Sequence, residues 1–193
     1  MIIFARIITF IFHPIVLVSP AVFLIIIATG YSLNEALLWS GVALGFVIFI
    51  ALYIRAGMMI GFFTNFDVSK REQRIYLFPL VILAGITFLF SLIVLNGPRS
   101  LFMAIIYFLI SVAVLTLVTL RIKASVHVGG ITAAIISAIY FFGVEFSFLL
   151  ILIPIMAWAR IKEKRHTYRE TVVGFALGLL LALVGIFGVQ YFT

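Results

Sequence analysis

The stretch VGGITAAIISAIYFFGVEFSFLLILIPIMAW, residues 128–158, decides how many times this chain crosses a membrane. As one helix it would be about 46 Å long, well beyond a hydrocarbon core about 30 Å thick. Gly143 and Glu145 lie near its middle, and a charged carboxylate is costly at the centre of a bilayer. We therefore expect two helices that meet near Gly143 and leave Glu145 close to water. One steeply tilted helix is the alternative.

Apolar stretches fill most of the remaining chain. Apolar residues make up 66% of the 193 positions and charged residues 10%, with a mean hydropathy of +1.38. Soluble domains carry about 25% charged residues. Besides the two halves of 128–158, the expected spans are 11–29, 37–63, 75–95, 101–120 and 171–192. The sequence predicts an all-α polytopic transmembrane helix bundle of six or seven helices, forming one domain over residues 1–193.

Three further features of the sequence bear on the N-terminal helix and on possible cysteine chemistry. Residues 1–29 lack the basic cluster and the small-residue cleavage site of a signal peptide, so we expect a helix of the mature protein. The absence of cysteine excludes disulfides and thiolate metal sites. His13-Pro14 is typical of a kink in the first helix.

Basic residues are distributed unevenly between the polar connectors. With seven helices the connectors alternate between two membrane sides, and the second side receives only Arg99. The first side receives Arg6, Lys70, Arg71, Arg74, Arg121, Lys123, Arg160, Lys162, Lys164, Arg165 and Arg169. The positive-inside rule accounts for this asymmetry and would make the first side the cytoplasmic face of the cell membrane. Convergence of basic side chains on a phosphate would account for it as well. Nucleic acid is not indicated by the net charge of +7, because no extramembrane domain remains to hold it.

Two of the three histidines, His127 and His166, lie in these basic connectors. His166 and Glu170 are four residues apart and share one face if the last helix begins before Glu170. The carboxylate can then accept the Nδ1 proton and leave a lone pair on Nε2. Taken singly, a histidine at the membrane–water boundary is more often an interface residue than a catalyst. Together with Arg160 they are the parts of phosphoryl transfer without a metal.

These residues carry a family resemblance over roughly the C-terminal half. The spacing Arg160-x5-His166-x3-Glu170 resembles SRxxxxxHxxxD, the third motif of the type 2 phosphatidic acid phosphatase superfamily. Ser125-Val126-His127 resembles its second motif, PSGH.

The resemblance implies a role for each matched residue. His166 would be the nucleophile that becomes a phosphohistidine, and Glu170 would orient it. His127 would protonate the leaving group, while Ser125 and Arg160 would hold phosphate oxygens. Members of this family use neither a metal nor another cofactor, so none is expected here.

The chain departs from the family in several places. The first motif, KxxxxxxRP, is absent, and the corresponding connector reads DVSKREQR over residues 67–74. We expect Lys70, Arg71 and Arg74 to supply the same positive charge, without a choice among them. Lys123 of the second connector is a further expected substrate-binding residue. Alanine, valine and alanine replace the family's Pro, Gly and Ser at positions 124, 126 and 159, and glutamate replaces aspartate at 170.

The expected function is a metal-independent phosphatase acting on a membrane lipid phosphate or an isoprenyl pyrophosphate. The alternative is a transporter or an anion-binding membrane protein whose basic face only attracts anionic lipid or solute. A magnesium-dependent prenyltransferase-like enzyme is less favoured, because Asp67 is the only aspartate. Arg55 is expected to snorkel or to pair with Asp67, and as an arginine within a membrane span it is equally a candidate for a functional role.

Overall fold

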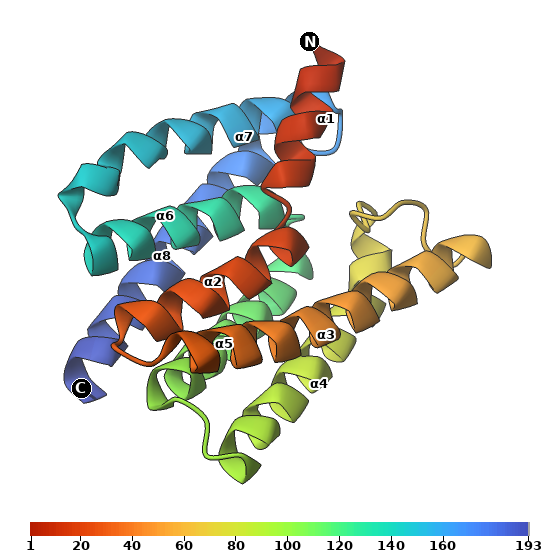
Figure 1. Ribbon diagram of the computed structural model, residues 1–193. Helices are drawn as coiled ribbons and strands as arrows, with labels where there is room; N and C mark the ends of the chain where they lie inside the picture. Colours follow the sequence, from red (N-terminus) through yellow and green to blue (C-terminus); the bar gives the residue numbers. More distant parts are fainter. Residues whose placement is uncertain (193) are drawn as a thin grey trace. The chain divides into compact units, whose positions relative to one another are not determined.

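The computed structural model describes the backbone of residues 1–192 and the side chains of residues 1–187. This part of the chain forms eight α-helices and one 3₁₀ helix, and it contains no strand (Figure 1). The elements are α1 (Ile2–Ile11), α2 (Pro14–Ala28), α3 (Leu33–Met59), α4 (Arg71–Val94), α5 (Arg99–Thr119), α6 (Val126–Phe142), η1 (Val144–Ile151), α7 (Leu152–Lys162) and α8 (Tyr168–Phe192). The predicted all-α class is confirmed.

The apolar helices fit a lipid environment. Six helical stretches of 19–27 described residues are long and apolar enough to cross a membrane, and α6 is a shorter apolar helix. Large apolar side chains such as Leu83, Phe90 and Leu117 are more than half exposed. Such surfaces are unfavourable in water and favourable against lipid tails. The chain is an integral membrane protein.

The break predicted within residues 128–158 is present at Gly143. This glycine has φ +115°, in the region that only glycine adopts easily, and it ends α6. η1 and α7 follow as one continuous apolar stretch over 144–162, and the chain doubles back at Gly143 (Figure 1). Glu145 is exposed beside the break. The two-helix prediction is confirmed, and the single tilted helix is wrong.

His13-Pro14 separates α1 from α2, which confirms the predicted kink. Pro14 is the first residue of α2, a position where its missing N–H removes no helical hydrogen bond. His13 Nδ1 accepts the amide proton of Ile15 at 3.2 Å and so caps this helix. The first span therefore covers residues 2–28 rather than 11–29.

Several helices begin earlier than hydropathy predicts, because their first turns are polar. α3 starts at Leu33 rather than Leu37, since Ser32 and Glu35 form a reciprocal capping box. α4 starts at Arg71 rather than Ile75, so that Arg71 and Arg74 of the basic connector belong to the helix.

The chain divides into two compact units, which are described separately. Unit 1 holds residues 1–17 and those from 122 onward, and unit 2 holds residues 18–121. The core of unit 1 joins α1, α6 and α7 through Ala5, Ile8, Val128, Ile131, Ile135, Ile153, Met156 and Ala159. The core of unit 2 joins α2 to α5 through Val22, Ile26, Ala36, Trp39, Ala43, Phe88, Leu92, Leu101 and Ile105. The single domain stays a prediction.

Within unit 1, α6 and α8 pack backbone against backbone. A Cβ atom on Gly174 would lie 2.5 Å from the Ser125 carbonyl oxygen, and one on Gly129 would lie 3.0 Å from the Gly174 carbonyl oxygen. A Cβ on Gly178 would overlap the backbone of Gly129 in the same way. This Gly174-x3-Gly178 pattern is the small-residue contact by which membrane helices approach closely.

Candidate functional site

The close approach of α6 and α8 brings two predicted connectors together at one end of unit 1. The Ser125 amide, just before α6, donates to the Glu170 carbonyl oxygen in the first turn of α8 at 3.1 Å. The N-termini of both helices therefore lie side by side. Helix N-termini carry partial positive charge and attract anions.

A tight turn fixes His166 directly after α7. The Arg160 carbonyl oxygen accepts the amide protons of Arg165 at 3.1 Å and of His166 at 3.3 Å. Lys164 takes φ +56°, the left-handed conformation that commonly closes a helix C-terminus. The conformation of this turn sets the backbone position of His166 relative to Arg160.

His166 makes the contact with Glu170 that their spacing predicts. Nδ1 of His166 lies 2.9 Å from Oε2 of Glu170, and the histidine is buried. Glu170 Oε2 also accepts the Thr167 amide proton at 3.2 Å, while the Glu170 amide donates to Thr167 Oγ1 at 3.3 Å. This is a capping box at the start of α8. The Thr167-x-x-Glu170 signal was readable in the sequence and was missed.

Lys123, which precedes α6, contacts the connector between α7 and α8. Its Nζ donates to the Arg165 carbonyl oxygen at 2.8 Å and lies 3.7 Å from Oε2 of Glu170. The predicted phosphate ligand thus places its charge beside the His166–Glu170 pair.

Arg160 is buried against a partner that sequence analysis did not select. Its Nη1 donates to Oε2 of Glu163 at 3.0 Å, and the Arg160 side chain is 0% exposed. Thr9 of α1 donates from Oγ1 to the same Glu163 oxygen at 3.1 Å. The three-residue spacing of Arg160 and Glu163 could have revealed this pair. Thr9 could not be found from sequence, because only the fold brings α1 to α7.

Ser125 and His127 lie at the start of α6. Ser125 is buried, and its Oγ accepts the Val128 amide proton at 3.4 Å as the helix cap. The buried His127 ring lies perpendicular to the His13 ring, with centroids 4.6 Å apart. The histidine of the kink thus contacts the predicted acid.

We call these side chains of unit 1 the polar cluster. Its members come from helices and connectors that are far apart in sequence, and they lie where α2, α6 and α8 begin and α7 ends. They are Thr9, His13, Lys123, Ser125, His127, Arg160, Glu163, His166 and Glu170.

The predicted residues of the first connector lie at the start of α4 in unit 2. Lys70 and Arg71 are exposed, and Arg71 Nη1 donates to the Leu120 carbonyl oxygen at 3.4 Å. Arg74 is buried and donates from Nε to the Val68 carbonyl oxygen at 3.1 Å. The three basic residues therefore occupy different environments, although one turn separates Lys70 from Arg74.

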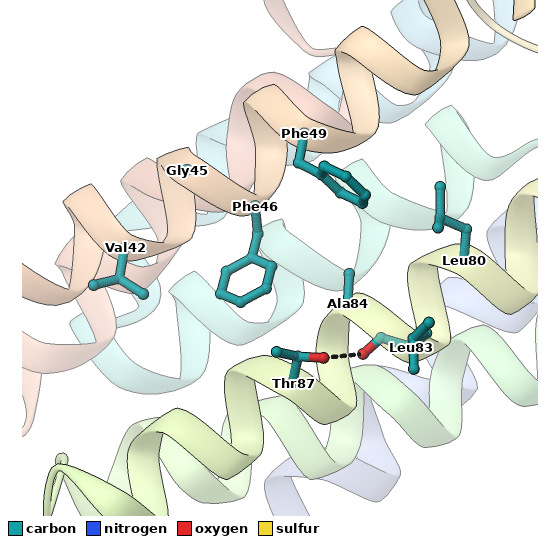
Figure 2. A pocket seen from close by; sticks show the side chains of 8 residues that line it. All are labelled: Val42, Gly45, Phe46, Phe49, Leu80, Leu83, Ala84 and Thr87. Atoms are coloured by element: carbon teal, nitrogen blue, oxygen red, sulfur yellow. Dashed lines mark hydrogen bonds between the residues drawn. The ribbon is translucent and has the colours of Figure 1, made fainter.

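Unit 2 has an apolar groove between α3 and α4, lined by uncharged side chains (Figure 2). Its volume is about 420 Å³, and its lining consists of Val42, Gly45, Phe46, Phe49, Leu80, Leu83, Ala84 and Thr87. The Thr87 hydroxyl donates to the Leu83 carbonyl oxygen at 2.9 Å. No charged side chain lines this groove, so it is not the candidate site.

Comparison with known protein families, with curated proteins and with solved structures finds no match. The chemistry of the polar cluster is therefore what indicates a function for this chain.

Proposed function

We propose that this chain is a metal-independent membrane lipid phosphatase that works through a phosphohistidine on His166. The observation that carries the proposal is the 2.9 Å contact between His166 Nδ1 and the Glu170 carboxylate. A carboxylate on Nδ1 selects the tautomer whose Nε2 lone pair is nucleophilic, and it stabilises the positive charge that develops on attack.

The proposed reaction has two balanced steps. In the first, His166 Nε2 forms a bond to phosphorus while the bond from phosphorus to the leaving oxygen breaks. His127 gives that oxygen a proton. In the second, water attacks phosphorus, returns a proton to His127 and releases inorganic phosphate as the nitrogen–phosphorus bond breaks. Covalent catalysis thereby divides one difficult displacement into two easier ones.

Positive groups around the cluster suit a phosphate substrate. Arg160 and Lys123 bring full charges, and the adjacent N-termini of α6 and α8 add partial ones. The Ser125 hydroxyl accepts a bond from Val128 and keeps its own proton for a phosphate oxygen. These groups would stabilise charge on the transferring phosphoryl group.

The substrate we propose is a lipid phosphomonoester or an isoprenyl pyrophosphate in the cell membrane, with the site on the cytoplasmic face. The apolar helices would let the tail stay in the bilayer while the headgroup reaches the basic end. Isoprenyl pyrophosphate is favoured over phosphatidate-type lipids, because the short connectors leave little room for recognising a larger headgroup.

Phosphate release in detergent tests the proposal. Purified protein, with chelator present throughout, is given an isoprenyl pyrophosphate and, separately, phosphatidate. We expect turnover of at least one, with inhibition by vanadate, which adopts the trigonal-bipyramidal geometry of the transferring phosphoryl group. Absence of turnover on both lipids, or insensitivity to millimolar vanadate, would contradict the proposal and favour an anion-binding or transport role.

A further inference from the structure

Glu163 is fixed from two helices. It follows the last residue of α7, where its amide donates to the Ala159 carbonyl oxygen at 3.0 Å. Its carboxylate Oε2 accepts from Arg160 Nη1 at 3.0 Å and from Thr9 Oγ1 at 3.1 Å. The Glu163 side chain is only 10% exposed. The carboxylate is thus held between α1 and α7.

This carboxylate matters because of what it does to Arg160. A buried guanidinium is costly unless a nearby negative charge and hydrogen bonds compensate it. The guanidinium is also planar, so a strong hydrogen bond at Nη1 restrains the orientation of the other N–H groups. These N–H groups of Arg160 must be aligned before phosphate binds, because misplacing a binding group by about 1 Å can cost a factor of about 100 in rate.

Two opposite roles for Glu163 are possible. A positioning residue would hold Arg160 ready for phosphate, whereas a competing anion would have to leave before phosphate could bind. The Thr9 hydrogen bond favours the first role, because leaving would break contacts to both α1 and Arg160.

We infer that Glu163, anchored by Thr9, is a positioning residue that aligns Arg160 for phosphate. The inference rests on the proposed phosphatase activity and makes α1 a part of the phosphate-binding end.

The test measures KM and kcat of purified variants in detergent, with the lipid that the wild-type protein hydrolyses as the substrate. For Glu163→Ala we expect KM and the vanadate concentration for half-inhibition to rise together, by about tenfold or more. Glu163→Gln should keep KM within about threefold of wild type, because its amide oxygen can accept from both Arg160 and Thr9, while loss of the negative charge beside the buried guanidinium should lower the unfolding midpoint. Thr9→Val should raise KM by a smaller factor than Glu163→Ala. Glu145→Ala, which removes an exposed carboxylate beside Gly143, is the charge-matched control and should change neither value.

Each other outcome has a definite meaning. Tighter vanadate binding or a lower KM in Glu163→Ala would overturn the inference, because it identifies a competing anion. An unchanged KM in Thr9→Val would overturn it as well, even if Glu163→Ala fails to fold. Turnover by wild type with unchanged Glu163→Ala kinetics would contradict this inference alone. No turnover by wild type would overturn the phosphatase proposal and this inference with it.

Discussion

Glu170 has a structural and a proposed chemical task, and both involve the same carboxylate oxygen. Oε2 caps α8 through the Thr167 amide and contacts Nδ1 of His166. A glutamine at the third helical position can still complete a capping box. The two tasks can therefore be separated by substitution.

We predict that Glu170→Gln lowers kcat by more than about tenfold while α8 stays capped. The amide lacks the negative charge that stabilises a positive His166 ring, and loss of an orienting carboxylate is costly in comparable catalytic groups. The thermal unfolding midpoint should remain close to that of wild type. Steady-state phosphate release and thermal unfolding in the same detergent measure both.

The matched variant is Thr167→Ala, which removes the other half of the capping box. Loss of such a cap costs about 1 kcal/mol of stability. We expect the unfolding midpoint to fall and kcat to stay within about threefold. If Glu170→Gln kept kcat within about threefold of wild type, the negative charge of Glu170 would be unnecessary, and its proposed role beside His166 would be contradicted.

Contacts between residues close in sequence could be predicted for this site, whereas contacts between different helices could not. Spacing along one helix start was enough to predict the His166–Glu170 contact, because residues four apart share a helix face. The pairing of Arg160 with Glu163 is equally local, but the motif resemblance assigns Arg160 to phosphate and does not include its carboxylate partner. The contacts of Thr9 with Glu163 and of His13 with His127 depend on packing between helices, which no local spacing encodes.

At the scale of elements, α6 and α8 keep the connectors together through glycine. The Ser125 amide can reach the Glu170 carbonyl oxygen only because Gly129, Gly174 and Gly178 allow the two backbones to touch. Hydropathy located both helices but says nothing about which helices pair, and the Gly174-x3-Gly178 pattern is the local signal that points to close packing.

We predict that Gly178→Ala destabilises the protein by about 1–3 kcal/mol, the usual cost of overpacking. Its Cβ would overlap the Gly129 backbone, which cannot yield as a flexible side chain would. Gly130→Ala is the control in the neighbouring helix, because its Cβ would meet Pro14 Cγ at 3.7 Å, an ordinary contact. Thermal unfolding in detergent distinguishes them, and equal midpoints for the two variants would mean that α6 and α8 do not pack through glycine.

Some helix boundaries could be predicted from the sequence and others could not. The break at Gly143 was predictable from length and charge, whereas the early start of α4 was not, because its first turn is polar. Composition was sufficient for the fold class, since six long apolar helical stretches leave few alternatives to a membrane bundle.

At the scale of the whole molecule, the proposed function requires a defined topology. If all seven apolar segments cross the membrane, we expect residues 70 and 164 on one side and residue 96 on the other. The chain has no cysteine, so single cysteines can report sidedness without a background. Lys70→Cys, Asn96→Cys and Lys164→Cys all replace exposed side chains.

We predict that a membrane-impermeant maleimide added to intact cells labels Asn96→Cys, whereas Lys70→Cys and Lys164→Cys react only after permeabilisation. The positive-inside rule gives this orientation. The inverse pattern would correct the cytoplasmic assignment and leave the catalytic proposal intact. Labelling of Lys70→Cys and Lys164→Cys from different sides would exclude a phosphate site that uses both basic connectors.

Trapping the covalent intermediate tests the phosphohistidine mechanism. Wild-type protein is mixed with a lipid substrate carrying radiolabelled terminal phosphate, denatured in alkali within milliseconds to seconds, and digested for mass spectrometry. We predict an alkali-stable, acid-labile phosphate on His166 that is absent from His166→Ala, whose hydrolysis is also abolished. Steady phosphate release from wild type without a labelled His166, or activity of His166→Ala above a tenth of wild type, would rule out His166 as the nucleophile.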